Sequence, residues 1–287
     1  MDVQISNLVK STLTWLVGNF RALVLVSLIP ATLLVLMAIV QSWMQINSFQ
    51  DLLAGAETSS FPASGQIIKN MILALLAFLI SGWLSVKVTR LRLLGAGAVG
   101  PASSDEIRCT YRSLLYQAAL IGMFISTYLT GLLLIVATGY LFGSISPAIL
   151  FALGVLAILG FAYAMVRFSA ALPAIAVGLK PKILKEMWPF AREYAWSLMG
   201  WMLLMAITVT LAFLLLSYVL MSGSFAAMQQ SPAAYMEYMQ ANRFKVIMAN
   251  VIFSLLNIPV YWFFVLYFAE VFEKIAARKG IWRANPA

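Results

Sequence analysis

Few side chains in this sequence could carry catalysis. It has no histidine and one cysteine, Cys109, so the commonest general base and metal ligand is missing, and neither an intrachain disulfide nor a cysteine-rich metal site can form. Carboxylates cluster at Asp105-Glu106 and at Glu186 with Glu193. Paired carboxylates can transfer protons or bind a metal. The first pair, however, falls at a predicted helix N-terminus and Glu186 lies one turn from Lys182, so we interpret both as solvated surface charge.

Two ionisable residues, Arg167 and Glu270, fall within about one turn of the ends of long apolar runs. Ionisable groups near hydrocarbon are costly, and they are functional candidates by default. Both can also reach the membrane surface or pair with a neighbouring helix. The sequence leaves a structural role and a role in gating or substrate contact open for each.

Asn257 and Pro259 fall in the middle of the last apolar run. Proline removes a helix hydrogen bond, and a buried amide seeks a partner on another helix. A broken helix at the midplane is typical of transporters. Prolines are also common in membrane helices for architectural reasons alone, so both interpretations stay open.

The elements that must position these residues are long apolar helices. Of the 287 residues, 63% are hydrophobic and 10% are charged, whereas soluble domains carry roughly 25% charged residues. A membrane-crossing helix needs about 20 mostly apolar residues. Six segments qualify: Ala22–Trp43, Ile67–Val88, Leu114–Ala137, Pro147–Val166, Ala195–Met221 and Val246–Phe272. We therefore predict an all-α integral membrane protein with six transmembrane helices, forming a single polytopic membrane domain over residues 1–287.

The distribution of Lys and Arg predicts the orientation of the chain. With the N-terminus inside, only Lys69, Arg243 and Lys245 of the 19 basic residues fall outside, and the net charge of +9 lies wholly on the inner side. Because cytoplasmic loops are enriched in Lys and Arg, both termini are expected in the cytoplasm. On the outer side, Ser231-Pro232 predicts the start of a short helix from Pro232 to Asn242.

Three amphipathic stretches precede the predicted helix pairs, starting near Val3, Ser103 and Pro181. They indicate three repeats of an interfacial helix followed by a hairpin, over residues 1–100, 101–179 and 180–287. Helices with one apolar and one basic face lie in the membrane interface and attract anionic lipid. The candidate contacts for anionic lipid on the cytoplasmic face are Lys10, Arg108, Arg112, Lys182, Lys185 and Arg192. These residues can alternatively serve only to set topology.

The run Arg167-Phe168-Ser169-Ala170-Ala171-Leu172-Pro173-Ala174-Ile175-Ala176-Val177, followed by Trp188 and Tyr194-Ala195-Trp196, resembles a family of bacterial membrane proteins. The family comprises YciC-type inner-membrane proteins and the membrane domain of some glycerophosphoryl diester phosphodiesterases. Asn19–Pro30 and Arg90–Gly95 are similar as well. The resemblance implies six helices and a bacterial inner membrane. Phosphodiesterase activity does not carry over, because the family's catalytic domain is a separate soluble module.

Three function classes remain open. The first is a non-catalytic membrane protein with a scaffold, assembly or lipid-organising role, which needs no enzyme site, no cofactor and no metal. The second is a transporter or channel for a small molecule or a lipid that uses a broken sixth helix. The third is a lipid-modifying enzyme built on acids such as Glu186 and Glu193. The expected partners are membrane lipids, which are anionic on the cytoplasmic face. A protein partner is left unidentified, and no nucleic acid is expected.

Overall fold

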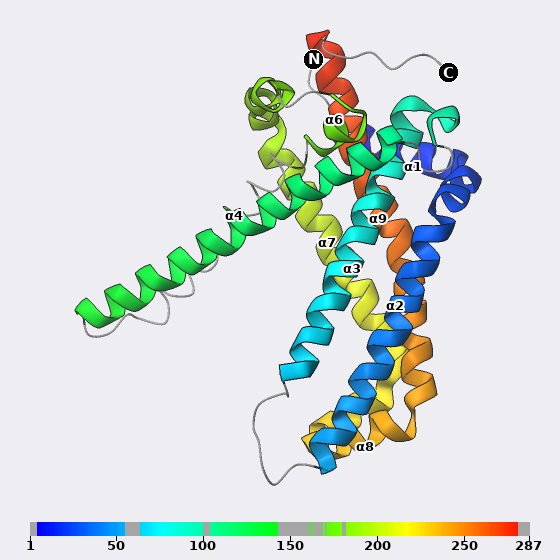
Figure 1. Ribbon diagram of the computed structural model, residues 1–287, viewed down its shortest axis with the longest axis vertical. Helices are drawn as coiled ribbons and strands as arrows, with labels where there is room; N and C mark the ends of the chain where they lie inside the picture. Colours follow the sequence, from blue (N-terminus) through cyan, green and yellow to red (C-terminus); the bar gives the residue numbers. More distant parts are fainter. Residues whose placement is uncertain are drawn as a thin grey trace. The chain divides into compact units, whose positions relative to one another are not determined.

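All secondary structure in the described residues is helical (Figure 1). This computed structural model describes residues 5–54, 64–99, 104–142, 171–179 and 182–280, together with Gly160, Tyr163 and Ser169. The elements are α1 (Ile5–Gly18), α2 (Phe20–Ala54), α3 (Ser64–Leu94), a short 3₁₀ helix η1 (Ala96–Ala98), α4 (Ser104–Phe142), α6 (Leu172–Ala176), α7 (Lys182–Gln230), α8 (Pro232–Ala241) and α9 (Arg243–Lys279). The predicted all-α class is confirmed over this part of the chain.

Within the described residues, four segments are long and apolar enough to cross a membrane. They are Phe20–Asn47, Ile68–Leu94, Met202–Gln230 and Arg243–Ala277. They overlap the first, second, fifth and sixth predicted spans, although the one at Met202–Gln230 begins and ends later in the chain than the predicted Ala195–Met221. Large apolar side chains on them face outward, including Leu25, Met71 and Val219, which are 65%, 67% and 72% exposed. Apolar surface on this scale is rare on soluble proteins. These features indicate a membrane protein.

The third predicted span lies within α4, which is one helix of 39 residues. The fourth, Pro147–Val166, falls mainly on residues outside those that the structure describes. Six spans, the three repeats and a single domain over residues 1–287 therefore stay predictions.

The three amphipathic stretches differ in how they join the spans that follow. The first is a separate helix, α1, because the chain turns at Asn19, after Gly18, before α2 begins. Glycine is a poor helix former, which favours a break there. The second and third continue without interruption into the apolar parts of α4 and α7. The expected boundary between interfacial helix and hairpin is therefore seen only in the first.

The predicted short helix after Ser231-Pro232 is confirmed as α8. The hydroxyl of Ser231 accepts a hydrogen bond from the backbone N–H of Ala234 at 3.0 Å, which satisfies one of the free N–H groups at the helix start. The preceding helix bends at Met221, whose φ and ψ are −127° and 28°. Met221 is also the residue at which the fifth span was predicted to end.

Two compact units can be recognised in the chain. The first comprises Met1–Gly18, Val86–Leu203 and Val265–Ala287, and the second comprises Asn19–Ser85 and Leu204–Phe264. The helices α3, α7 and α9 contribute residues to both. In the first unit, Phe272, Ala269 and Tyr267 of α9 pack with Leu8, Leu93 and Met199. In the second, Ile46 of α2, Met239 of α8 and Val246 of α9 form a smaller apolar cluster.

Candidate functional site

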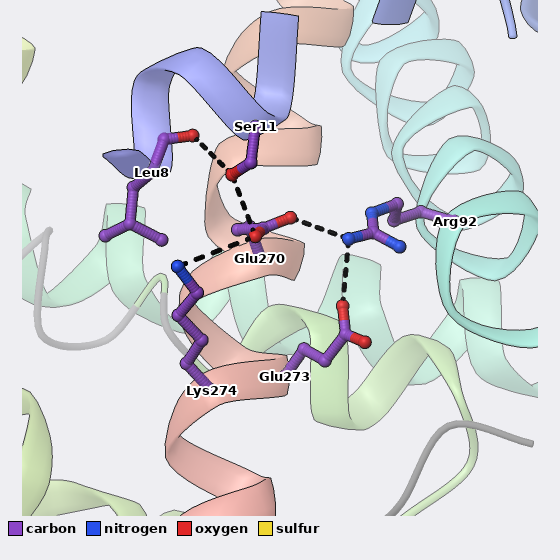
Figure 2. Close-up of polar contacts among 6 residues, drawn as sticks. All are labelled: Leu8, Ser11, Arg92, Glu270, Glu273 and Lys274. Carbon is purple, nitrogen blue, oxygen red and sulfur yellow. Dashed lines mark hydrogen bonds and ion pairs between the residues drawn. The ribbon is translucent and has the colours of Figure 1, made fainter. Parts of the chain in front are cut away.

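Charged side chains from α3 and α9 meet in the first unit (Figure 2). The guanidinium of Arg92 contacts Glu270 Oε2 at 2.6 Å and Glu273 Oε2 at 3.0 Å. Lys274 Nζ lies 3.7 Å from Glu270 Oε1. The side chain of Glu270 is 8% exposed. Two acids and two bases balance one another, so burial leaves no net charge in the cluster.

The helix α1 joins this charge cluster through two side chains. The hydroxyl of Ser11 donates to Glu270 Oε1 at 2.9 Å and lies 3.0 Å from the carbonyl oxygen of Leu8. The ring of Trp15 lies 5.3 Å from the centre of the Arg92 guanidinium, within the range of a cation–π contact. Glu270, one of the two predicted intramembrane ionisable residues, thus forms an ion pair with Arg92 of α3 and accepts a hydrogen bond from Ser11 of α1.

A second buried ion pair joins α3 to α4. Lys87 Nζ lies 3.3 Å from Glu106 Oε1, and the two side chains are 11% and 1% exposed. The interpretation of Asp105-Glu106 as solvated surface charge is wrong for Glu106, although Asp105 is exposed. The pattern was misleading because an acid in the first helical turn needs no partner to be favourable. Tertiary packing has nevertheless directed Glu106 inward.

Arg90, which lies between Lys87 and Arg92 in the sequence of α3, contacts the C-terminal end of α6. Its Nη1 donates to the carbonyl oxygen of Ala176 at 3.3 Å and lies 3.8 Å from Cys109 Sγ. Gly178 adopts a φ of +82° just beyond α6, and the N–H of Leu179 bonds to Ala174 O at 3.0 Å. This is the Schellman arrangement, in which glycine avoids the strain of a left-handed φ. A cation is favourable at the negative end of the helix.

The second unit contains a cavity of about 640 Å³, which is partly open. This volume lies within the range of roughly 300–1,000 Å³ that is usual for ligand pockets. Its lining comes from α2, α3 and α9: Leu34, Met37, Ala38, Gln41, Ser42, Gln45, Ala77, Ser81, Leu84, Asn250, Phe253, Ser254, Asn257, Ile258, Val260, Tyr261 and Phe264.

The polar lining follows from helical spacing. Asn250, Ser254, Asn257 and Tyr261 recur every three or four residues and so share one face of α9. Two of them tie this face to its neighbours, since Asn250 Nδ2 donates to Ser42 Oγ at 2.9 Å and the Tyr261 hydroxyl donates to Ser81 O at 2.7 Å. The cavity is therefore bounded by helices that are hydrogen-bonded to one another.

Asn257 lines this cavity, and its side chain is exposed. The helix α9 continues from Arg243 to Lys279 with Pro259 inside it. Because α9 runs through Pro259 without an interruption, the unwound break on which the transport alternative relied is absent from this helix. Asn257 remains a candidate because of the cavity and not because of a broken helix.

The predicted lipid-contact residues are described only in part. The side chains of Lys10, Arg108 and Arg112 are exposed. The side chains of Lys182, Lys185 and Arg192, and the whole of Arg167, lie outside the described part of the structure. The same holds for the side chains of Glu186 and Glu193, so the acid pair proposed for a lipid-modifying enzyme stays a prediction.

Two features were missed by reasoning from the sequence. Arg92 was counted only as a topology signal, and nothing in its local pattern shows that it meets Glu270, 178 residues away in the chain. The cavity had a visible signal, because the polar residues of α9 and Gln41, Ser42 and Gln45 of α2 each recur at helical spacing within apolar runs. Only Asn257 was noticed.

Comparison with known proteins yields no match: no family model, no curated protein and no solved structure corresponds to the chain.

Proposed function

We propose that this chain is a non-catalytic integral membrane protein that organises lipid and binds anionic lipid through the basic face of its interfacial helices. On this proposal the protein lies in a bacterial inner membrane with both termini in the cytoplasm. The resemblance to YciC-type proteins and the distribution of Lys and Arg support that location.

The observation that carries the proposal is the surface of α4. Ile107, Tyr111 and Leu115 lie four residues apart and are 60%, 62% and 52% exposed. Arg108 and Arg112 follow the first two and are exposed beside this apolar stripe. The opposite face is buried, with Glu106, Cys109 and Ser113 at 1%, 4% and 1% exposure. A helix fixed to the protein on one side, with adjacent apolar and basic stripes on the other, suits an anionic membrane surface.

The helix α1 repeats this arrangement on a smaller scale. Leu8 and Thr12 are buried, whereas Leu13 and Val17 are 46% and 73% exposed. Lys10 is exposed on the same side, three residues before Leu13. The two helices supply three exposed cations next to apolar surface.

The test is native mass spectrometry of the variant Arg108→Gln/Arg112→Gln with its copurifying lipid. Each cation near an anionic surface contributes about 1 kcal/mol, so bound phosphatidylglycerol and cardiolipin should fall about tenfold after losses to screening. The matched control is Arg243→Gln/Lys245→Gln, an exposed basic pair around exposed Phe244 on the predicted outer side. If the amount of copurifying anionic lipid is unchanged in Arg108→Gln/Arg112→Gln, or falls equally in this variant and in the control, the two arginines serve only to set topology.

A second candidate, transport of a small molecule or a lipid, draws support from the cavity between α2, α3 and α9. Polar groups that line a cavity at membrane depth are common to transporters. The measurement is movement of a small molecule or a lipid across the membrane of proteoliposomes that contain the purified protein. Movement above that of protein-free liposomes would favour transport over a purely lipid-organising role.

A further inference from the structure

Two polar side chains that line the cavity have no hydrogen-bond partner among the described residues. Asn257 and Gln41 are both exposed, and each carries an amide that can donate and accept. Because both side chains are exposed to the cavity, water or a ligand that occupies it can supply the hydrogen-bond partner. Membrane helices generally pair such groups with one another. These two face a space large enough for a ligand instead.

The polar and apolar parts of the cavity are separated along the helices. Leu34, Ser81 and Val260 lie near the middle of the spans Phe20–Asn47, Ile68–Leu94 and Arg243–Ala277. Gln41 and Gln45 lie toward the Asn47 end of α2, and Asn250 lies toward the Arg243 end of α9. The cavity therefore has a polar end, formed by Gln41, Gln45 and Asn250, and a mainly apolar floor of residues such as Leu34, Leu84 and Phe264 nearer the midplane. Asn257 lies between the two, and the hydroxyl of Tyr261 at the floor is already bonded to Ser81 O.

The chemistry of the lining restricts the ligand. None of the described side chains around the cavity is charged. An ionised headgroup would lose its hydration there without gaining a counter-ion, which is strongly unfavourable. Amide and hydroxyl groups are matched by hydroxyl or ester oxygens, and the apolar floor is matched by hydrocarbon. A fully water-soluble molecule would leave the floor without apolar contacts.

We propose that this cavity binds an uncharged lipid with a hydroxyl-bearing head, of the diacylglycerol class. The head lies between Gln41 and Asn257 and bonds to their amides, while the acyl chains follow the apolar floor and leave through the open side. This site is separate from the basic faces of α1 and α4, and its ligand differs from theirs in charge.

The experiment compares dioleoylglycerol with dioleoylphosphatidylglycerol, which have the same chains and differ in head charge. Binding to the full-length protein in detergent is measured by native mass spectrometry. At the cavity, the wild-type protein should bind one dioleoylglycerol in preference to the anionic lipid, whose binding to the basic faces of α1 and α4 does not depend on the cavity. Asn257→Leu removes an amide without much change in volume, and it should weaken dioleoylglycerol binding about tenfold.

A second variant keeps the test decisive if Asn257→Leu does not fold. Ala77→Phe fills the cavity from α3 and should abolish dioleoylglycerol binding. The matched controls are Leu75→Phe and Thr208→Val, and both should bind dioleoylglycerol as the wild type does. Leu75 is an exposed position of α3 outside the cavity lining. Thr208 is exposed on α7 and bonds to its own helix at Leu204 O, at 2.9 Å. A diazirine-bearing dioleoylglycerol should cross-link to the segments 34–45, 77–84 or 250–264.

Three results would overturn the proposal. The first is that both lipids bind equally well and that Ala77→Phe does not change their binding. The bound lipid would then be nonspecific lipid on the surface of the spans. The second is a cavity-dependent preference for dioleoylphosphatidylglycerol. The third is no binding of dioleoylglycerol, or cross-links confined to other segments. None of these results affects the proposal for Arg108 and Arg112, which is tested separately by copurifying anionic lipid.

Discussion

The charge cluster of the first unit and the cavity of the second both place polar side chains on apolar helices, but they differ in how those side chains are paired. In the cluster, Arg92, Glu270 and Glu273 contact oppositely charged partners within 3.0 Å. In the cavity, Asn257 and Gln41 face open space and have no partner among the described residues.

This difference separates a structural role from a binding role. A buried charge that is fully paired has no remaining capacity for a ligand, and its removal leaves its partner buried and unpaired. An exposed amide that no neighbouring residue pairs is free to bond to a ligand, and its removal leaves no buried partner unpaired. We therefore expect substitutions in the charge cluster to lower the free energy of unfolding and a substitution at Asn257 to leave it nearly unchanged.

The largest expected effect is at Arg92. Arg92→Met removes the partner of two acids, and breaking a buried ion pair in this way typically costs 3–5 kcal/mol. Because the Arg92 side chain is 18% exposed, we expect a loss at the lower end, about 3 kcal/mol. The measurement is the free energy of unfolding in mixed micelles.

The matched control for Arg92 lies in the same cluster. Lys274 is 3.7 Å from Glu270 but 38% exposed, and exposed pairs contribute at most about 1 kcal/mol. If Lys274→Met costs as much as Arg92→Met, the effect reflects total charge and not the buried contacts.

A smaller effect is expected at Glu106. Glu106→Gln preserves the volume and can still accept a hydrogen bond from Lys87, but it removes the negative charge that faces the buried ammonium. We expect a loss of about 1–3 kcal/mol in the free energy of unfolding. Asp105→Asn, at the exposed neighbour, should change it by less than about 0.5 kcal/mol. Similar losses at both positions would mean that the helix start, and not the ion pair with Lys87, is responsible.

Much of the helical framework could be predicted from the sequence, because the signals for it are local. Long apolar runs, the Ser231-Pro232 start of α8 and the separate α1 all depend on neighbouring residues. The orientation of Glu106 and the partner of Glu270 could not be predicted, because each depends on contacts between segments that are distant in the sequence. The interfacial stretches before the third and fifth spans were placed correctly as helices, but their continuity with α4 and α7 was not foreseen. In the second stretch no glycine or proline stands at the junction with the span, whereas in the third α7 continues through Pro189.

The candidate site was predictable only in fragments. Glu270 and Asn257 were identified because polar residues in apolar runs stand out individually. The cavity depends on three helix faces meeting, and periodicity within one helix does not show which other helix it packs against. Both interpretations of Pro259 were left open, and α9 continues through it, since a proline within a membrane helix does not have to unwind it.

The most direct test of the contrast between the two regions is the free energy of unfolding of Asn257→Leu, measured without added lipid beside Arg92→Met. Because Asn257 is exposed and has no partner among the described residues, the account predicts stability unchanged within about 1 kcal/mol, against a loss for Arg92→Met. A loss of more than about 2 kcal/mol for Asn257→Leu would contradict it, since this would show that Asn257 is a paired structural residue like those of the charge cluster.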